Sequence, residues 1–130
     1  MKTLLVLVLG LMLTSVLGYA GPEPTKRGYG SRDGAIEAAR DLQNKCARYC
    51  IYGRSAGLVY LQTWSELSDR RFGIRVEAIA GCMAGDDLVK YAKDYNKVIL
   101  EYVSKQYGAT AWRDCIEKSE ADYQKRRSTD

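Results

Sequence analysis

The chain has 130 residues with four cysteines and no histidine, and 20 Lys and Arg stand against 16 Asp and Glu. One domain is the natural count at this length, and a hydrophobic content of 46% with two prolines excludes a disordered or collagen-like chain. Without histidine, Ser-His-Asp catalysis, Cys-His catalysis and His-ligated zinc are excluded within this chain. The net charge of +4 comes without a dense basic stripe, so we expect no nucleic-acid partner.

Residues 1–20 are predicted to be a cleaved secretory signal peptide. Lys2 supplies a short positive segment, residues 4–13 form an uncharged apolar run, and Gly18 and Ala20 occupy the −3 and −1 positions of a cleavage site. The alternative, a transmembrane anchor, is weaker because spanning a bilayer takes about 20 apolar residues. We therefore expect a periplasmic or secreted protein with no membrane contact after cleavage.

After this signal we expect a flexible leader at residues 21–30, one helical domain at 31–123 and a charged tail at 124–130. Ser31 or Asp33 caps the first predicted helix, in which apolar residues recur at steps of three and four as far as Trp64. This stretch is either one long helix or two helices with a kink near Gly53. A polar connection is expected at residues 65–73, and residues 74–83 fit a strand or a short buried helix equally well.

The clearest predicted helix begins after Gly85 and ends at Gly108, a residue typical of helix C-caps. Thr110 caps a last helix that carries Trp112 and Cys115. The apolar stripe of the helix between Gly85 and Gly108 holds Leu88, Tyr91, Ala92, Tyr95, Val98, Ile99, Tyr102 and Val103. The predicted fold is thus all-α, a compact bundle of three to four helices.

All four cysteines follow the predicted signal, and an even number in an oxidising compartment indicates disulfide bonds. Cys46 and Cys50 are i,i+4 on a predicted helix, where Cβ atoms lie about 5–6 Å apart, against about 3.8 Å in a disulfide. We therefore expect each of them to pair with Cys82 or Cys115, which gives two disulfide cross-links. A Cys₄ zinc site is the weaker alternative, because thiols outside the cytosol are usually oxidised.

The sequence predicts no catalytic residue, no cofactor and no metal site, so we expect the protein not to be an enzyme. Asp86 and Asp87 form the tightest carboxylate pair, but they precede a helix, where negative charge is favourable without any catalytic or calcium-binding role. The Gly-x-x-x-Gly spacing of Gly53 and Gly57 lacks the Lys-Ser/Thr of a phosphate-binding loop. Ser55 and Ser119 have no candidate base.

Several segments resemble the type VI secretion amidase immunity proteins, which are small exported helical bacterial proteins with four cysteines in a similar order. The first is Leu42-x-x-x-Cys46 followed by Tyr49-Cys50-Ile51-Tyr52-Gly53-Arg54-Ser55-Ala56-Gly57. The others are Cys82 to Leu88, the stripe Tyr95-x-x-Val98-Ile99-x-x-Tyr102-Val103, and Cys115 in the last helix. The resemblance covers residues 42–115.

This resemblance implies an exported immunity protein, often a homodimer, that binds a cognate peptidoglycan-degrading amidase toxin and blocks its active site. Within the predicted polar connection, residues 68–73 are the candidate plugging loop, in which Arg70, Arg71 and Phe72 are the candidate contact residues because aromatic and arginine side chains suit interface hot spots. The alternative for this segment is a solvated turn with Phe72 folded back on the core.

A competing hypothesis is a small secreted helical carrier that holds an apolar ligand between its aromatic-rich helices. An apolar cavity would favour the carrier, whereas a plug-type inhibitor has a filled core. A third class, a secreted interaction protein without a small ligand, stays open as well.

Overall fold

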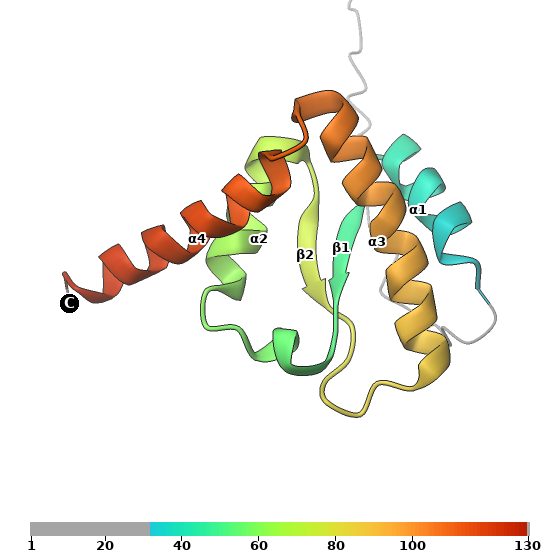
Figure 1. The fold of residues 1–130 in the computed structure, drawn as a ribbon, viewed down its shortest axis with the longest axis horizontal. Coiled ribbons are helices and arrows are strands. Elements are labelled where there is room, and N and C mark those ends of the chain that lie inside the picture. The colour runs from blue at the N-terminus through green and yellow to red at the C-terminus, as the bar shows by residue number, and fades with distance from the viewer. Residues whose placement is uncertain (1–31, 130) are drawn as a thin grey trace, which may run out of the picture.

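The computed structural model describes residues 32–129 (Figure 1), so the predicted signal peptide and the leader at residues 21–30 lie outside the described residues. Within them, no helix is both long enough and apolar enough to cross a bilayer. The last helix continues through part of the predicted charged tail. The elements are, in order, α1 (Gly34–Gln43), β1 (Arg48–Ile51), the 3-10 helix η2 (Gly53–Gly57), α2 (Leu61–Phe72), β2 (Arg75–Ala78), α3 (Asp86–Tyr107) and α4 (Ala111–Arg127).

The prediction of an all-α bundle with two disulfides is wrong, because the chain contains a two-stranded parallel sheet. β1 pairs with β2 in a register that places Arg48 beside Arg75 and Ile51 beside Ala78. The connection between the strands consists of η2 and α2, as parallel strands require a long crossover. Consequently α2 occupies the segment that was expected to be a polar connection, and the strand alternative holds for part of residues 74–83.

The long first helix predicted from the sequence is interrupted at its tenth residue by a Schellman motif. Lys45 has a φ of 55°, and the N–H of Cys46 donates to the carbonyl of Asp41 while the N–H of Lys45 donates to that of Leu42. Beyond this turn, residues 48–51 are buried or half-buried on both faces of the sheet. A strand buried on both faces does not alternate apolar and polar residues. The apolar residues of β1 therefore happened to continue the three- and four-residue spacing of the preceding helix.

Each outer edge of the sheet is covered by side chains from a helix. On the β1 edge, the Asn96 amide of α3 donates to the carbonyl of Cys50 at 2.7 Å and accepts from its N–H at 2.8 Å. On the β2 edge, the Ser65 hydroxyl of α2 accepts from the N–H of Val76 at 3.1 Å. These contacts supply partners for strand groups that an isolated two-stranded sheet would leave exposed.

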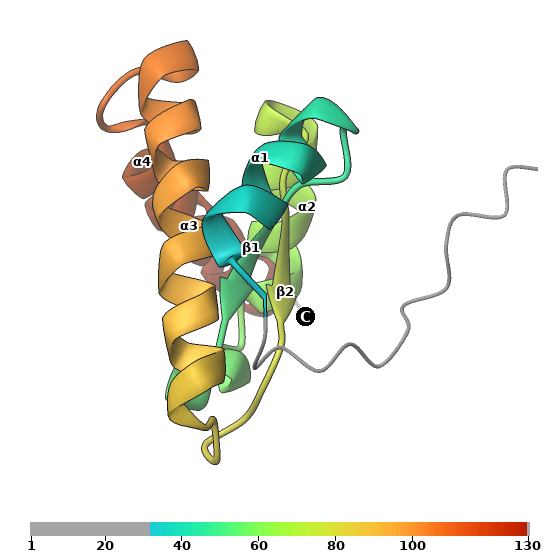
Figure 2. The same ribbon diagram turned by 90° about the vertical axis from the view of Figure 1, so that its right-hand side faces the viewer.

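The sheet lies between α3 and α2 (Figures 1 and 2), with α1 packed on α3 and α4 packed on α2. α1 approaches α3 so closely that a Cβ on Gly34 would lie 2.3 Å from the carbonyl oxygen of Tyr91. On the other side of the sheet, the ring of Trp112 in α4 lies 4.8 Å from that of Tyr49, 5.8 Å from Trp64 and 5.7 Å from Phe72. This aromatic cluster joins β1, α2 and α4.

The four cysteines are free thiols, which corrects the two predicted disulfides. Cys46 precedes β1 and Cys82 follows β2, so the two lie beyond opposite ends of the parallel sheet, and both are exposed. Cys50 and Cys115 are buried. The predicted pairing assumed that Cys46 and Cys50 share a helix. Cys46 instead lies in the turn between α1 and β1, and Cys50 lies within β1.

Candidate functional site

An open groove of about 870 Å³ lies between α3 and β1, and it extends to η2, the start of α2 and the middle of α4. The wall formed by α3 is one helical face whose members recur at steps of three and four: Lys93, Asn96, Lys97, Leu100, Glu101, Ser104 and Lys105. The facing wall is largely aromatic and aliphatic and includes Tyr49, Ile51, Tyr52, Leu58, Tyr60, Trp64 and Ile116. This combination of a polar rim with apolar walls is typical of ligand sites.

The aromatic wall is held in place by packing. The Tyr49 ring lies 5.7 Å from the Trp64 ring, and both contact Trp112 beneath them. The opposite wall is fixed to the sheet through the two hydrogen bonds between Asn96 and the main chain of Cys50. Both walls therefore keep their positions without a ligand.

The indole N–H of Trp64, a groove residue that is 4% exposed, has no hydrogen-bond partner within residues 32–129. The same holds for the indole of Trp112. Buried tryptophan N–H groups usually find a partner, so these two side chains are placed by ring packing alone.

Charge is distributed unevenly along the α3 wall. Lys93, Lys97 and Lys105 stand against a single acid, Glu101, and none of the four forms an ion pair within the part of the chain that the structure describes. Elsewhere on the helices, Lys90 pairs with Asp94 at 2.6 Å and Lys118 with Asp122 at 3.1 Å. The groove rim of the described chain thus carries a net positive charge, and none of its lysines is held in an ion pair.

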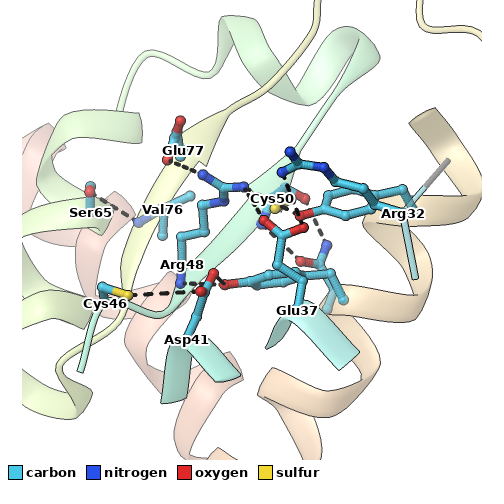
Figure 3. A network of polar contacts seen from close by, with 12 residues as sticks. Arg32, Glu37, Asp41, Cys46, Arg48, Cys50, Ser65, Val76 and Glu77 are labelled. Carbon is cyan, nitrogen blue, oxygen red and sulfur yellow. Dashed lines mark hydrogen bonds and ion pairs between the residues drawn. The ribbon is translucent and has the colours of Figure 1, made fainter. Parts of the chain in front are cut away.

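A second polar feature, the Arg48 cluster, lies on the α1 side of the sheet (Figure 3). The Arg48 guanidinium contacts Glu37 at 3.8 Å, Glu77 at 3.6 Å and the Tyr91 hydroxyl at 3.3 Å. Its main-chain N–H donates to the Tyr95 hydroxyl, which itself donates to Asp41 at 2.7 Å. The cluster therefore connects α1, both strands and α3.

Two tyrosines and the arginine of the Arg48 cluster keep their ordinary protonation states at neutral pH. Burial raises the pKa of Tyr91 to about 12 and also raises that of Tyr95, whose hydroxyl donates to Asp41. Burial lowers the pKa of Arg48, but the hydrogen bond to Tyr91 and the charge of Glu77 raise it more. The two tyrosine hydroxyls are therefore neutral and the guanidinium is charged at neutral pH, so these three groups act here as hydrogen-bond and ion-pair partners.

Three of the cysteines are weakened as nucleophiles in this fold. Burial raises the pKa of Cys50 to about 11 and also raises that of Cys115. Desolvation and the neighbouring Asp41 raise the pKa of Cys46. Because the thiolate is the reactive form, these raised pKa values lower the reactivity of the three thiols at neutral pH. No group of three or more His, Cys, Asp or Glu side chains that could hold a metal ion occurs within residues 32–129.

The candidate contact residues predicted from the sequence belong to the last turn of α2, away from the groove lining. Arg70 and Arg71 are exposed, and Arg71 lies over the Phe72 ring at 5.3 Å. Phe72 is 5% exposed and packs against Tyr107 and Trp112. The proposed contact of this segment with an amidase stays a prediction.

The sequence reasoning missed the groove because it followed only the apolar stripe of α3. A second signal was present on the same helix, where lysines recur at positions 93, 97 and 105 around Asn96 and Leu100. That spacing places them on one face. The facing wall could not be found, since it depends on where β1 and η2 lie.

Comparisons with protein-family models, with curated proteins and with solved structures gave no match. The resemblance to type VI amidase immunity proteins therefore rests on the residues quoted for it and stays a prediction.

Proposed function

We propose that this chain is an exported binding protein without catalytic activity, which carries an elongated apolar ligand in the groove between α3 and β1. The observation that supports this most directly is an open groove of about 870 Å³ with a wall of aromatic side chains. Small-molecule sites typically have volumes of about 300–1,000 Å³ and mostly apolar walls. Export is supported by the N-terminal sequence pattern, and the periplasm or the extracellular space is the proposed location.

The groove offers affinity through apolar burial on a rigid frame. Each methylene group removed from water contributes about 0.8 kcal/mol. The Tyr49 and Trp64 rings are already ordered by their contact with Trp112, so a ligand does not have to immobilise them. An apolar chain of modest length can therefore bind with micromolar affinity.

Nothing in the groove is arranged for turnover. The Cys50 thiol, with a pKa of about 11, is protonated at neutral pH. Within residues 32–129, no hydrogen bond joins the hydroxyl of Ser55 or Ser104 to a carboxylate or an amine. Binding, rather than covalent or acid–base catalysis, is the chemistry that these side chains support.

A titration of the full chain with Nile red, an uncharged apolar dye, tests the proposed function. We expect micromolar binding that is lost in Ser104→Trp, because the indole fills the groove, and kept in Gln106→Trp, which adds the same side chain at an exposed position of α3 outside the lining. The apolar run at residues 4–13 is common to both variants and cannot produce a difference between them. Equal binding by both variants, with unchanged circular dichroism, would show that the dye does not occupy the groove.

The inhibitor hypothesis has less support from the geometry. One of its three candidate contact residues, Phe72, is buried, and all three lie outside the groove. An open groove is also what distinguishes a carrier from a plug-type inhibitor with a filled core. Binding to a cognate amidase stays a prediction for which co-purification from a periplasmic extract is the test.

A further inference from the structure

We infer that the ligand of the groove is a single-chain amphiphile with an anionic head group, bound with its head at Lys93 and Lys97 and its chain along the aromatic wall. This inference rests on the proposed function and adds to it the chemical class and the direction of the ligand.

The length of the groove suits an extended chain. Its α3 wall runs from Lys93 to Lys105, and this stretch of helix is about 18 Å long at 1.5 Å per residue. Side chains of β1, α2 and α4 line the other side. An open site with a wall of this length suits one extended hydrocarbon chain.

The charges along this wall give the groove a direction. Lys93 and Lys97 lie one turn apart at one end, and the acid between them in sequence, Asp94, pairs with Lys90 and is not part of the lining. Glu101 lies one turn from both Lys97 and Lys105, so it offsets part of the charge at either end, and two lysines remain at one end against one at the other. The end formed by Lys93 and Lys97 is therefore the more positive one, and a negative head group is favoured there.

The lysines at the positive end are free to bind a ligand. Neither forms an ion pair within residues 32–129, and both are exposed at the rim. Lys90, one turn earlier on the same helix, is held by Asp94 and lies outside the groove. An incoming carboxylate would pair with Lys93 and Lys97 without breaking an existing ion pair.

An exposed leucine supplies the apolar part of the α3 wall. Leu100 is 37% exposed on α3, and Ile116 of α4 and the buried Trp64 of α2 lie on the opposite wall. A hydrocarbon chain that starts at Lys97 and follows α3 toward Ser104 passes Leu100 on the way. Covering this exposed leucine contributes to binding.

Displacement of Nile red from the full chain at pH 8 by oleic acid and by oleyl alcohol tests the inference, because these two probes differ in the charged head group. We expect oleate to bind more tightly than the alcohol. Lys93→Gln and Lys97→Gln should each weaken oleate binding about five-fold and leave the alcohol unchanged. Added NaCl should weaken oleate binding in the parent chain.

Two further variants remove the same charge elsewhere. Lys125→Gln lies at an exposed position of α4 outside the lining and breaks no ion pair within residues 32–129, so it should bind oleate as the parent chain does. Lys105→Gln lies at the other end of the groove and should weaken oleate binding less than Lys93→Gln or Lys97→Gln. Equal affinity for oleate and the alcohol, or equal effects of all four variants, would overturn the inference while the proposed function still stands. Displacement by an acidic amphipathic peptide but not by oleate would also overturn it. Loss of the proposed function itself is a separate result, seen when Nile red binds Ser104→Trp and Gln106→Trp equally.

Discussion

The side-chain amide of Asn96 on α3 satisfies both main-chain groups of Cys50 in β1, with hydrogen bonds of 2.7 and 2.8 Å. An asparagine thus takes the place that a third strand would occupy at this edge of the sheet. Because Asn96 also lines the groove, the same contact fixes the distance between the two walls of the proposed binding site.

Replacing Asn96 should destabilise the fold. Asn96→Ala leaves the N–H and the carbonyl of Cys50 without their partner, and we expect a loss of about 3 kcal/mol in the free energy of unfolding. Urea denaturation followed by circular dichroism measures it. Gln106→Ala removes an exposed amide from the same helix and should stay within about 0.5 kcal/mol of the parent chain. Equal stabilities of the two variants would contradict this account of the sheet edge.

The close approach of α1 to α3 depends on Gly34. Because an added Cβ would lie 2.3 Å from the carbonyl oxygen of Tyr91, Gly34→Ala must push the helices apart, and we expect a loss of about 2–3 kcal/mol. Gly57→Ala is the matched control, since a Cβ there meets nothing within 4 Å. Thermal unfolding of both variants is the measurement. A melting temperature of Gly34→Ala equal to that of the parent chain would mean that α1 and α3 are not in this contact.

Thiol reactivity should divide the cysteines into two pairs. Cys46 and Cys82 are exposed, whereas Cys50 is 1% and Cys115 0% exposed. With Ellman's reagent we expect the two exposed thiols to react in the native protein and the other two only after unfolding. A reducing agent should leave the melting temperature unchanged. Finding no free thiol in the denatured, unreduced protein would restore the disulfide prediction.

Stability should fall in alkaline solution because buried acidic groups must stay protonated in the folded state. Burial raises the pKa of Tyr91 from 10.0 to about 12 and that of Cys50 from 9.0 to about 11. The unfolded chain therefore releases these protons at a lower pH than the folded chain. The contribution of the two groups to the free energy of unfolding is complete below pH 9 and is lost progressively up to about pH 12. Urea unfolding between pH 8 and 11.5 measures how steeply the free energy of unfolding falls with pH.

The groups that surround these two side chains are Glu37 on α1, Arg48 on β1 and Glu77 on β2. Tyr91→Phe keeps the ring and removes the titrating hydroxyl, so its stability should decline less steeply above pH 10 than that of the parent chain. An identical slope in the variant would assign the alkaline loss to other groups.

Local signals predicted several elements well. The Asp33 side chain accepts hydrogen bonds from the N–H groups of Ala35 and Ile36, as expected for an N-cap. The apolar stripe of α3 is buried at Tyr95 and Ile99, and Gly108, with a φ of 108°, ends the helix as predicted. Each of these features depends on residues within one or two turns.

The predictions that were wrong all depended on distant partners. Residues 48–51 were expected to be helical because their apolar residues continued the spacing of α1, and residues 74–83 had no visible strand to pair with. The path of the whole chain determines the strand register that places Arg48 beside Arg75. It also determines that the four cysteines are free.

The sequence alone excluded histidine chemistry and predicted α3 and the cap or end of several helices. Composition and short-range spacing suffice for these features. Only the tertiary structure decided that two segments form strands, since their edges are satisfied by Asn96, 46 residues from Cys50, and by Ser65, 11 residues from Val76. The groove arises in the same way: its lysine face belongs to one helix, but its aromatic wall exists only because packing brings β1, α2 and α4 opposite that face.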